Sequence, residues 1–304
     1  MPELPEVETL VRRLGPRLRG RRILGFESAW PRALENFTPV QARRQLAGAR
    51  LVEVGRRGKF FRLGTDRGLW LLGHLRMSGN LFLGLPGAPA PRFLRHRLLF
   101  EGGSELQFTD SRKFGRLRLT EDPASDLDAL GPEPLERGWT SAVFWAALRR
   151  RRRQLKPLLL DQTFLAGLGN IYADESLHRA RLHPLRNAAT LKAEEVRRLH
   201  AAIRRTLREA IRACGSSFDF VYATLEGRPA GRFQDRLRVY GRAGEPCGSC
   251  GARRVVRILV AQRGTHLCPG CQPAPRKRSV SGRSRAGKVS RTRRSGSPGR
   301  RGPR

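Results

Sequence analysis

The spacing of hydrophobic residues along the chain changes from a helical period to short strands. Apolar residues recur at intervals of three and four between Val7 and Leu14, which predicts a helix over residues 5–14 that Gly15-Pro16 ends. From about residue 20 to 120, short apolar runs alternate with Gly- and Pro-rich turns. These runs predict strands over residues 50–54, 69–72, 98–100, 105–108 and 117–120. A β-sandwich or barrel-like domain follows.

The pattern becomes helical again after residues 131–134, where Gly-Pro-Glu-Pro marks a boundary. Residues 143–148 show a helical period, and a stronger helix is predicted over residues 191–213. Thr190 suits the N-cap of this second helix, and Gly215 lies just past its end. The second domain is therefore expected to be mostly helical.

The charge of the chain points to a polyanionic partner. Its 304 residues include 61 Lys and Arg but only 26 Asp and Glu, a formal net charge of +35. Arginine forks match phosphate oxygens, and a charge of this size repels itself unless a polyanion is bound. In Leu165–Asp174, two glycines precede a short helix, and such a turn presents backbone N–H groups to a phosphate. The sequence therefore favours nucleic acid as the partner.

The two ends of the chain refine this interpretation. Residues 273–304 hold twelve basic residues and no acid, so we expect a disordered tail, while the preceding residues still carry +23. The start, MPELPEVETL, is acidic and contains proline, unlike a signal peptide. No run of about 18 apolar residues could span a bilayer. We therefore expect no membrane association and a protein that stays where it is made.

The cysteine spacing predicts a metal centre. Cys247 and Cys250 form one C-x2-C pair, and Cys268 and Cys271 form a second pair after 17 intervening residues. Four thiolates at this spacing close a tetrahedral site, so we expect one structural Zn²⁺ and no open position for catalysis. Arginines on the intervening hairpin would grip a phosphate backbone. The fifth cysteine, Cys214, is expected to be a small buried apolar residue.

The N-terminus offers a candidate nucleophile. If Met1 is removed, Pro2 becomes a secondary amine whose pKa would lie around 8 in an unperturbed chain. Such an amine can attack C1′ of a sugar and form an iminium directly. Glu3 adjoins it and can transfer a proton. On residue types alone, the alternative is an acidic first turn of a helix that begins at a proline.

Several separated motifs follow one another along the chain. They are MPELPEVE, Gly55–Lys59, His74–Gly79, Asp110–Gly115, Gly167–Glu175, Val239–Cys247 and Ala261–Arg263, together with the four cysteines. In this order they resemble the formamidopyrimidine-DNA glycosylases over about residues 1–272. The resemblance implies an α+β multidomain fold. Its expected parts are an N-terminal catalytic β-sandwich with flanking helices (1–134), a helix-two-turn-helix domain (135–235), a zinc-finger hairpin or ribbon (236–272) and the basic tail (273–304).

The resemblance also implies roles for four candidate catalytic residues. Pro2 matches the nucleophile of the family, and Glu3 matches the acid for base release. Lys59 matches the lysine of β-elimination and phosphate contact, and Arg263 matches the hairpin arginine of δ-elimination. The segment between the two cysteine pairs is one residue longer here than in the family pattern, which is expected to affect the hairpin register and the reach of Arg263.

A second set of residues is expected to contact DNA. An enzyme that acts on a base in duplex DNA extrudes it and fills the gap. Met77, Arg112 and Phe114 match the void-filling residues of the family, and residues 215–231 match its base-capping loop. The remaining expected contacts are His74, His96, Arg151 and Asn170.

The sequence thus predicts a bifunctional DNA glycosylase and AP lyase of base excision repair. Its expected substrate is double-stranded DNA with oxidised purines, such as 8-oxoguanine and formamidopyrimidines. We expect a monomer in the bacterial cytoplasm, associated with the nucleoid. Two alternatives stay open: an endonuclease VIII-like enzyme for oxidised pyrimidines, and a noncatalytic zinc protein that binds lesions.

Overall fold

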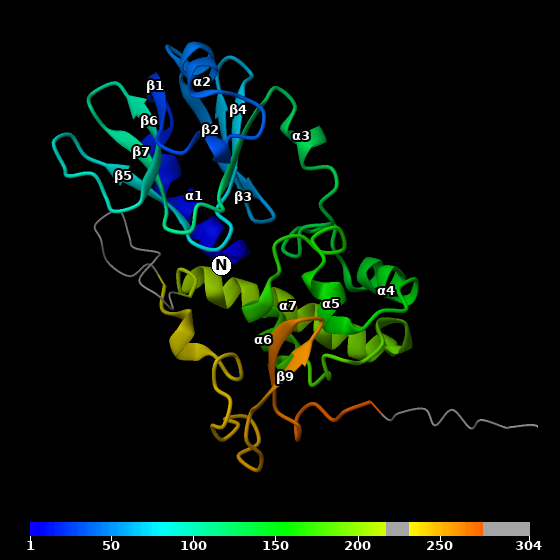
Figure 1. The fold of residues 1–304 in the computed structure, drawn as a ribbon. Coiled ribbons are helices and arrows are strands. Elements are labelled where there is room, and N and C mark those ends of the chain that lie inside the picture. Colours follow the sequence, from blue (N-terminus) through cyan, green and yellow to red (C-terminus); the bar gives the residue numbers. More distant parts are fainter. Residues whose placement is uncertain (217–230, 276–304) are drawn as a thin grey trace, which may run out of the picture.

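The computed structural model describes residues 1–216 and 231–275. These residues form a β-rich N-terminal part and a helical part that carries a small hairpin (Figure 1). Within them, no helix is both long and apolar enough to cross a membrane. The expected base-capping loop and basic tail lie almost entirely outside the described residues.

Eight strands form two antiparallel sheets in the N-terminal part. The strands are β1 (Ile23–Ser28), β2 (Leu51–Arg57), β3 (Phe60–Thr65), β4 (Trp70–His74), β5 (Gly79–Gly84), β6 (Leu94–Phe100), β7 (Glu105–Asp110) and β8 (Arg116–Thr120). One sheet has the order β1-β6-β7-β5 and the other the order β2-β3-β4-β8. Large apolar side chains of both sheets, such as Phe61 and Phe100, share one buried core. The predicted sandwich is confirmed.

Helix α1 (Leu4–Leu18) joins the two parts of the molecule. Its apolar face packs in the sandwich core, whereas Leu4 at its start lies in the core of the helical part. The helix does not end at Gly15-Pro16 as predicted but continues to Leu18. Leu18 is completely buried, and Arg19 N donates to Gly15 O (3.1 Å), so packing holds the last turn in spite of the proline.

The helical part surrounds a second core. Its elements are α4 (Ser141–Arg149), α5 (Leu155–Leu160), α6 (Asn170–Arg179), η2 (Ala188–Thr190), α7 (Ala193–Arg212) and η3 (Phe233–Arg236). The elements α2 (Pro39–Leu46) and η1 (Pro31–Ala33) belong to the sandwich, and α3 (Pro123–Asp126) follows β8, to which Asp126 is joined by an ion pair with Arg118. The long helix α7 starts after Lys192, not after Thr190. Thr190 instead donates from Oγ1 to Asn187 O (2.8 Å) within the preceding turn, while Lys192 N donates to Glu195 (2.8 Å).

A two-stranded hairpin of β9 (Val256–Val260) and β10 (Arg263–Leu267) completes the fold. Ala261 and Gln262 form its two-residue turn, both at positive φ (46° and 60°), and Arg263 pairs with Val260 directly after the turn. The hairpin packs against α6. The extra residue between the cysteine pairs therefore leaves Arg263 at the first position of β10.

Candidate active site and zinc centre

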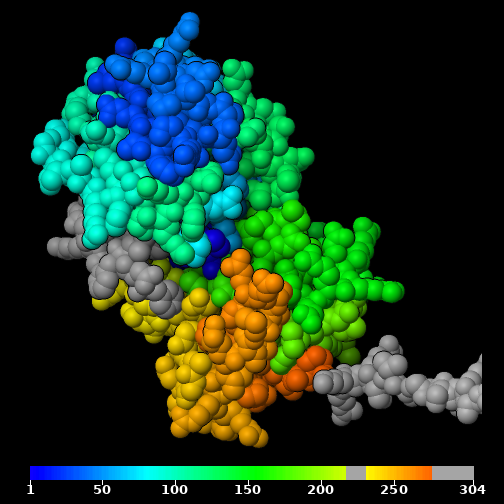
Figure 2. All heavy atoms as spheres, viewed as in Figure 1, coloured from blue at the N-terminus to red at the C-terminus, as the bar shows by residue number. Residues whose placement is uncertain are grey.

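The N-terminus lies where the two parts of the molecule meet. Figure 2 shows its dark blue atoms in a hollow between the sandwich, the helical part and the orange hairpin. Pro2 is buried there, whereas Met1 is 47% exposed. Met1 thus lies partly at the surface, while Pro2 is enclosed.

The carboxylate of Glu3 sits at the N-terminus of α6. Ile171 N donates to its Oε1 (2.9 Å), and Tyr172 N lies 3.5 Å from its Oε2. Backbone N–H groups of the segment predicted to face a phosphate, those of Ile171 and Tyr172, are therefore directed at Glu3. Burial raises the pKa of Glu3 to about 7, and Glu6 adds to this effect, whereas the charge of Lys59 opposes it. A carboxyl with such a pKa is partly protonated near neutrality, which suits a general acid.

Glu6 connects α1 to the segment that follows α7. Its carboxylate accepts from Tyr172 Oη (2.5 Å), Ser216 N (2.8 Å) and Glu3 N (2.9 Å). Burial raises the pKa of Glu6. The backbone next to Pro2 is thus fixed from both parts of the molecule.

Lys59 lies in the turn between β2 and β3 and is only 5% exposed. Burial lowers its pKa, which the nearby charges of Glu3 and Glu6 oppose and that of Arg263 reinforces. Buried Glu133 holds the turn, because it accepts from Gly58 N (2.5 Å), Arg56 Nη1 (2.7 Å) and Arg57 Nη1 (3.2 Å). Lys59 and Glu3 therefore lie close enough for the charge of each to shift the pKa of the other.

The hairpin turn that carries Arg263 is anchored next to the same cluster. The carbonyl oxygen of Gly264 accepts from Asn170 Nδ2 and from Lys156 Nζ, both at 3.1 Å. Lys156 is completely buried and pairs with Asp174 (2.5 Å), whose other oxygen accepts from His266 N (2.8 Å). Arg263 itself is exposed. Asn170 thus faces the hairpin, and its Oδ1 has no partner among the described residues.

His74 ends strand β4 close to Lys59. Its Nδ1 accepts from Arg76 N (2.9 Å), and its ring lies edge-on to Phe60, 4.7 Å between centroids. Burial and then the charges of Arg76 and Lys59 lower its pKa to about 3. The ring is therefore neutral, with its proton on Nε2 as a hydrogen-bond donor.

Met77, Arg112 and Phe114 lie together on two neighbouring turns of the sandwich. Met77 and Phe114 are each 45% exposed, Arg112 Nη1 lies 3.5 Å from Met77 Sδ, and its guanidinium stacks 5.2 Å from the centre of the Phe114 ring. Asp110 fixes both turns: it accepts from Ser78 Oγ, Arg112 N (3.1 Å) and Gly115 N (2.7 Å). The three side chains form an exposed tip on a rigid base.

Two further predicted DNA contacts differ in exposure: His96 is buried, and Arg151 lies at the surface. His96 is 3% exposed in the sandwich, where its Nδ1 lies 2.9 Å from Ser28 Oγ. Its ring stacks on Phe26 and lies edge-on to Phe108. His96 is thus largely enclosed by the sandwich, and its contact with DNA stays a prediction. Arg151 is exposed just beyond α4.

The four cysteines converge as their spacing predicts. Their Sγ atoms all lie within 4.8 Å of one another, with Cys247 3.9 Å from Cys271 and Cys250 3.7 Å from Cys268. Four sulfurs at about 2.3 Å from a tetrahedral Zn²⁺ would be about 3.8 Å apart. The residues therefore fit one structural zinc ion, which would hold the two knuckles of the ribbon together.

Sequence reasoning missed the residues that position the site. Glu133 and the Lys156–Asp174 pair bind backbone groups far away in the sequence, whereas Asp110 binds backbone groups of the turn that follows it and the distant side chain of Ser78. A local signal existed for Asp110, since an Asp ahead of a turn often accepts backbone N–H groups two or more residues later. Nothing in the local sequence marks the other three.

Three segments of the chain match the models of known families. Residues 1–117 match the formamidopyrimidine-DNA glycosylase N-terminal domain, and residues 130–221 match its H2TH domain. Residues 244–274 match a zinc finger found in FPG and IleRS. The order of the matches follows the order of the parts described above.

Individual relatives extend these matches over the whole fold. The formamidopyrimidine-DNA glycosylase of Symbiobacterium thermophilum is 45% identical over 289 residues, 93% of each chain. That of Chloroflexus aurantiacus is 45% identical over 276 residues, covering 90% of this chain and 98% of the relative.

Solved structures with a similar fold point to the same family. A complex between the Lactococcus lactis Fpg and DNA containing an abasic site superposes with a TM-score of 0.82 at 36% identity. A complex of the wild-type Lactococcus lactis Fpg with DNA containing N7-benzyl-Fapy-dG gives 0.83 at 37% identity. Each match covers 90% of this chain and 100% of the other. The chain therefore belongs to the formamidopyrimidine-DNA glycosylase family.

Proposed function

We propose that this protein excises oxidised purines from double-stranded DNA and then nicks the strand at the resulting abasic site. As a member of the family it is a DNA glycosylase of base excision repair that binds DNA. The names of its relatives and the Fapy-dG in a neighbouring complex support a purine lesion as the substrate. The single observation that carries the proposal is the enclosure of Pro2 beside a carboxyl, Glu3, with a pKa of about 7.

The proposed first step needs a free Pro2 nitrogen. Once Met1 is removed, this nitrogen attacks C1′ of the damaged nucleotide, the glycosidic bond breaks, and its electron pair leaves with the base. Glu3 supplies the proton that the departing base takes up. The nitrogen then loses its proton, its lone pair breaks the C1′–O4′ bond of the sugar ring, and O4′ takes up a proton. The product is an iminium ion between Pro2 and C1′ of the ring-opened sugar.

Elimination follows from the acidity that the iminium confers on the sugar. Loss of a C2′ proton breaks the bond from C3′ to the 3′ phosphate (β-elimination), and a second elimination breaks the bond to the 5′ phosphate (δ-elimination). We assign Lys59 to the first step, because burial lowers its pKa and favours an uncharged amine. We assign Arg263 to the second step, because its charge lowers the pKa of Lys59 and it therefore lies near that residue.

The remaining candidates are proposed to hold the DNA. Neutral His74 would donate its Nε2 proton to a phosphate, and Asn170 and Arg151 would contact the backbone. The exposed tip of Met77, Arg112 and Phe114 would enter the duplex and fill the space left by the extruded nucleotide. The zinc ion, when bound, keeps the ribbon folded and takes no part in the chemistry.

Borohydride trapping tests the proposal. The purified full-length protein should give a covalent adduct with an 8-oxoguanine duplex, and Pro2→Gly, which replaces the secondary amine by a primary one, should strongly reduce the adduct while retaining binding to the duplex. A duplex with thymine glycol tests the endonuclease VIII-like alternative, which predicts faster trapping on that substrate. Lesion binding without any adduct would instead identify a noncatalytic lesion-binding protein.

We further propose that the protein acts as a monomer in the cytoplasm, on the nucleoid and away from membranes. The support is indirect: its DNA substrate, bacterial relatives and an active site built from one chain. Sedimentation of the free protein and of its DNA complex tests the oligomeric state.

A further inference from the structure

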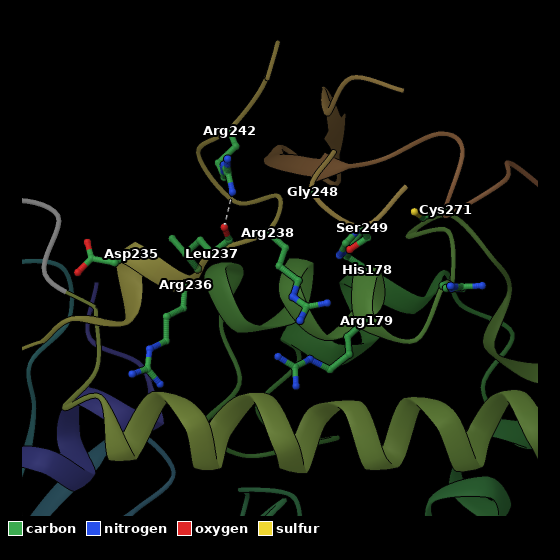
Figure 3. A pocket seen from close by; sticks show the side chains of 11 residues that line it. His178, Arg179, Asp235, Arg236, Leu237, Arg238, Arg242, Gly248, Ser249 and Cys271 are labelled. Carbon is green, nitrogen blue, oxygen red and sulfur yellow. Dashed lines mark hydrogen bonds between the residues drawn. The ribbon is translucent and has the colours of Figure 1, made fainter. Parts of the chain in front are cut away.

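A cavity of about 480 Å³ lies at the far end of α6 from the active site. Its walls come from three places: the end of α6, the segment around residues 235–242, and the zinc ribbon (Figure 3). Helix α6 rises about 1.5 Å per residue, so His178 in this cavity stands about 12 Å along the helix from Asn170 at the hairpin. The cavity is therefore separate from the cluster around Glu3.

The lining of this cavity is dominated by arginine. The residues are Arg179, Arg181, Arg236, Arg238 and Arg242, and Asp235 is the one acidic residue among the described lining. Figure 3 shows Arg236, Arg238 and Arg179 extending toward α7. So many guanidinium groups around one space repel one another unless an anion lies between them.

Counter-charges within the protein neutralise only part of this lining. Arg179 pairs with Glu209 (2.6 Å), and Arg242 pairs with Glu245 (2.7 Å). Across the described ranges, the side chains of Arg181, Arg236 and Arg238 form no ion pair. Three guanidinium groups are thus available to a ligand.

The backbone that presents these arginines is fixed before any ligand arrives. The carboxylate of buried Glu175 accepts from Arg238 N (3.0 Å), Val239 N (2.9 Å) and Tyr240 N (2.9 Å). Arg242 Nη1 donates to Leu237 O (2.9 Å), the bond drawn in Figure 3. Such preorganisation lowers the entropy lost on binding.

A buried polar atom in the wall also lacks a partner. His178 is 2% exposed and lines the cavity, and its Nδ1 makes no hydrogen bond within the described residues. Its Nε2 lies 3.6 Å from Cys247 Sγ. A buried nitrogen without a partner is costly, and a hydrogen-bonding group in the cavity would satisfy it.

We propose that this cavity, the α6-end pocket, binds a free oligophosphate, such as the phosphate chain of a nucleotide or inorganic polyphosphate. Guanidinium forks match phosphate oxygens in shape and charge. A concave space of a few hundred Å³ admits a small ligand, whereas a rigid duplex touches only its rim. The bound chain would bridge α6, the 235–242 segment and the zinc ribbon, and so stabilise their packing.

Calorimetric titration of the zinc-loaded, full-length protein with tripolyphosphate at 150 mM salt tests the proposal. Arg236→Ala/Arg238→Ala should weaken binding by about tenfold or more, because charge-assisted hydrogen bonds are lost. The matched control, Arg43→Ala/Arg44→Ala, removes two exposed arginines from α2 and should leave the affinity within about twofold. Arg236→Gln/Arg238→Gln, with uncharged polar side chains, replaces the alanine variant if that one does not fold.

The outcomes separate the sources of the phosphate. Equal affinity of the wild type, the pocket variant and the control would overturn the proposal. Binding of an abasic duplex that falls in the pocket variant alone would identify a DNA phosphate contact and overturn the free oligophosphate. Loss of tripolyphosphate binding with unchanged duplex binding would support it. Borohydride trapping through Pro2 does not depend on this pocket, so the two proposals fail independently.

Discussion

The carboxylate of Glu3 accepts the backbone N–H of Ile171, 168 residues further along the chain, at 2.9 Å. Glu3 belongs to the segment that carries the candidate nucleophile, and Ile171 belongs to the first turn of α6. One hydrogen bond therefore fixes the proposed acid relative to the helix that faces the hairpin. It also means that the positive end of the α6 dipole acts on Glu3 rather than on a phosphate.

Glu3→Gln removes the proposed proton donor but retains an acceptor for Ile171. We expect base release in single turnover to fall by a factor of about 100 or more, the range typical of general acids. Nicking of a preformed abasic site should fall much less. If base release survives the substitution unchanged, Glu3 is not the acid.

The pH profile provides an independent test of the same residue. The pKa of Glu3 is raised to about 7, so its acid form is present below that pH and is lost as the pH rises through it. We therefore expect base release by the wild type to decline above about pH 7 in single-turnover measurements. The profile of Glu3→Gln should lack this decline, and a decline of equal size in both proteins would contradict the assignment.

Glu133→Ala should destabilise the turn that carries Lys59. The substitution leaves Arg56 without one of its buried partners and Gly58 N without its acceptor, at a cost of about 3 kcal/mol. Urea unfolding measures this loss. The control Glu53→Ala breaks an exposed pair with Arg62 and should cost less than about 1 kcal/mol. Similar losses in the two variants would contradict the role of Glu133.

Met77→Ala/Phe114→Ala should slow excision from duplex DNA. Extruding a paired base costs a few kcal/mol, which the exposed tip helps to offset, so we expect about a tenfold reduction or more. Base release from a single-stranded substrate measures the chemistry without this cost and should change little. Val52→Ala truncates a comparably exposed side chain on β2 and serves as the control. A slowing that is equal on both substrates would place the defect elsewhere.

Removal of zinc should release the hairpin without unfolding the sandwich. The ribbon core consists of little more than Val239, Val255 and two of the cysteines, too few apolar residues to fold alone. A strong chelator should therefore abolish binding to abasic DNA, while hydrogen exchange stays slow in β3 and β7. Metal content by mass spectrometry confirms the removal. Full affinity in the metal-free protein would contradict a structural role.

Local signals predicted much of the fold and of the site. The zinc ligands follow from the two C-x2-C pairs, because each knuckle is a local turn, and the sandwich follows from short strands between glycine-rich turns. The grouping of Met77 with Phe114 came only with the family resemblance, since it depends on two turns that approach through sheet pairing.

Features that depend on tertiary packing could not be predicted from the sequence. Pro16 is a helix breaker in isolation, but burial of Leu18 outweighs that preference. His96 stands on a strand where one face is solvated and the other lies in the core, and only strand register decides which face it takes. Glu133 accepts from a backbone N–H 75 residues away, and Glu3 accepts from one 168 residues away, so no local pattern reveals these hydrogen bonds.

The buried pair of Lys156 and Asp174 restricts how this chain can change over time. Loss of one partner leaves the other charge buried without its counter-charge, at a cost of several kcal/mol. It also removes a hydrogen bond to the hairpin, because Lys156 donates to Gly264 O and Asp174 accepts from His266 N. Either substitution alone is thus expected to be selected against, and a simultaneous exchange for two apolar residues would still leave the N–H of His266 without its acceptor. Lys156 and Asp174 are therefore expected to be retained together in related sequences, although 18 residues separate them.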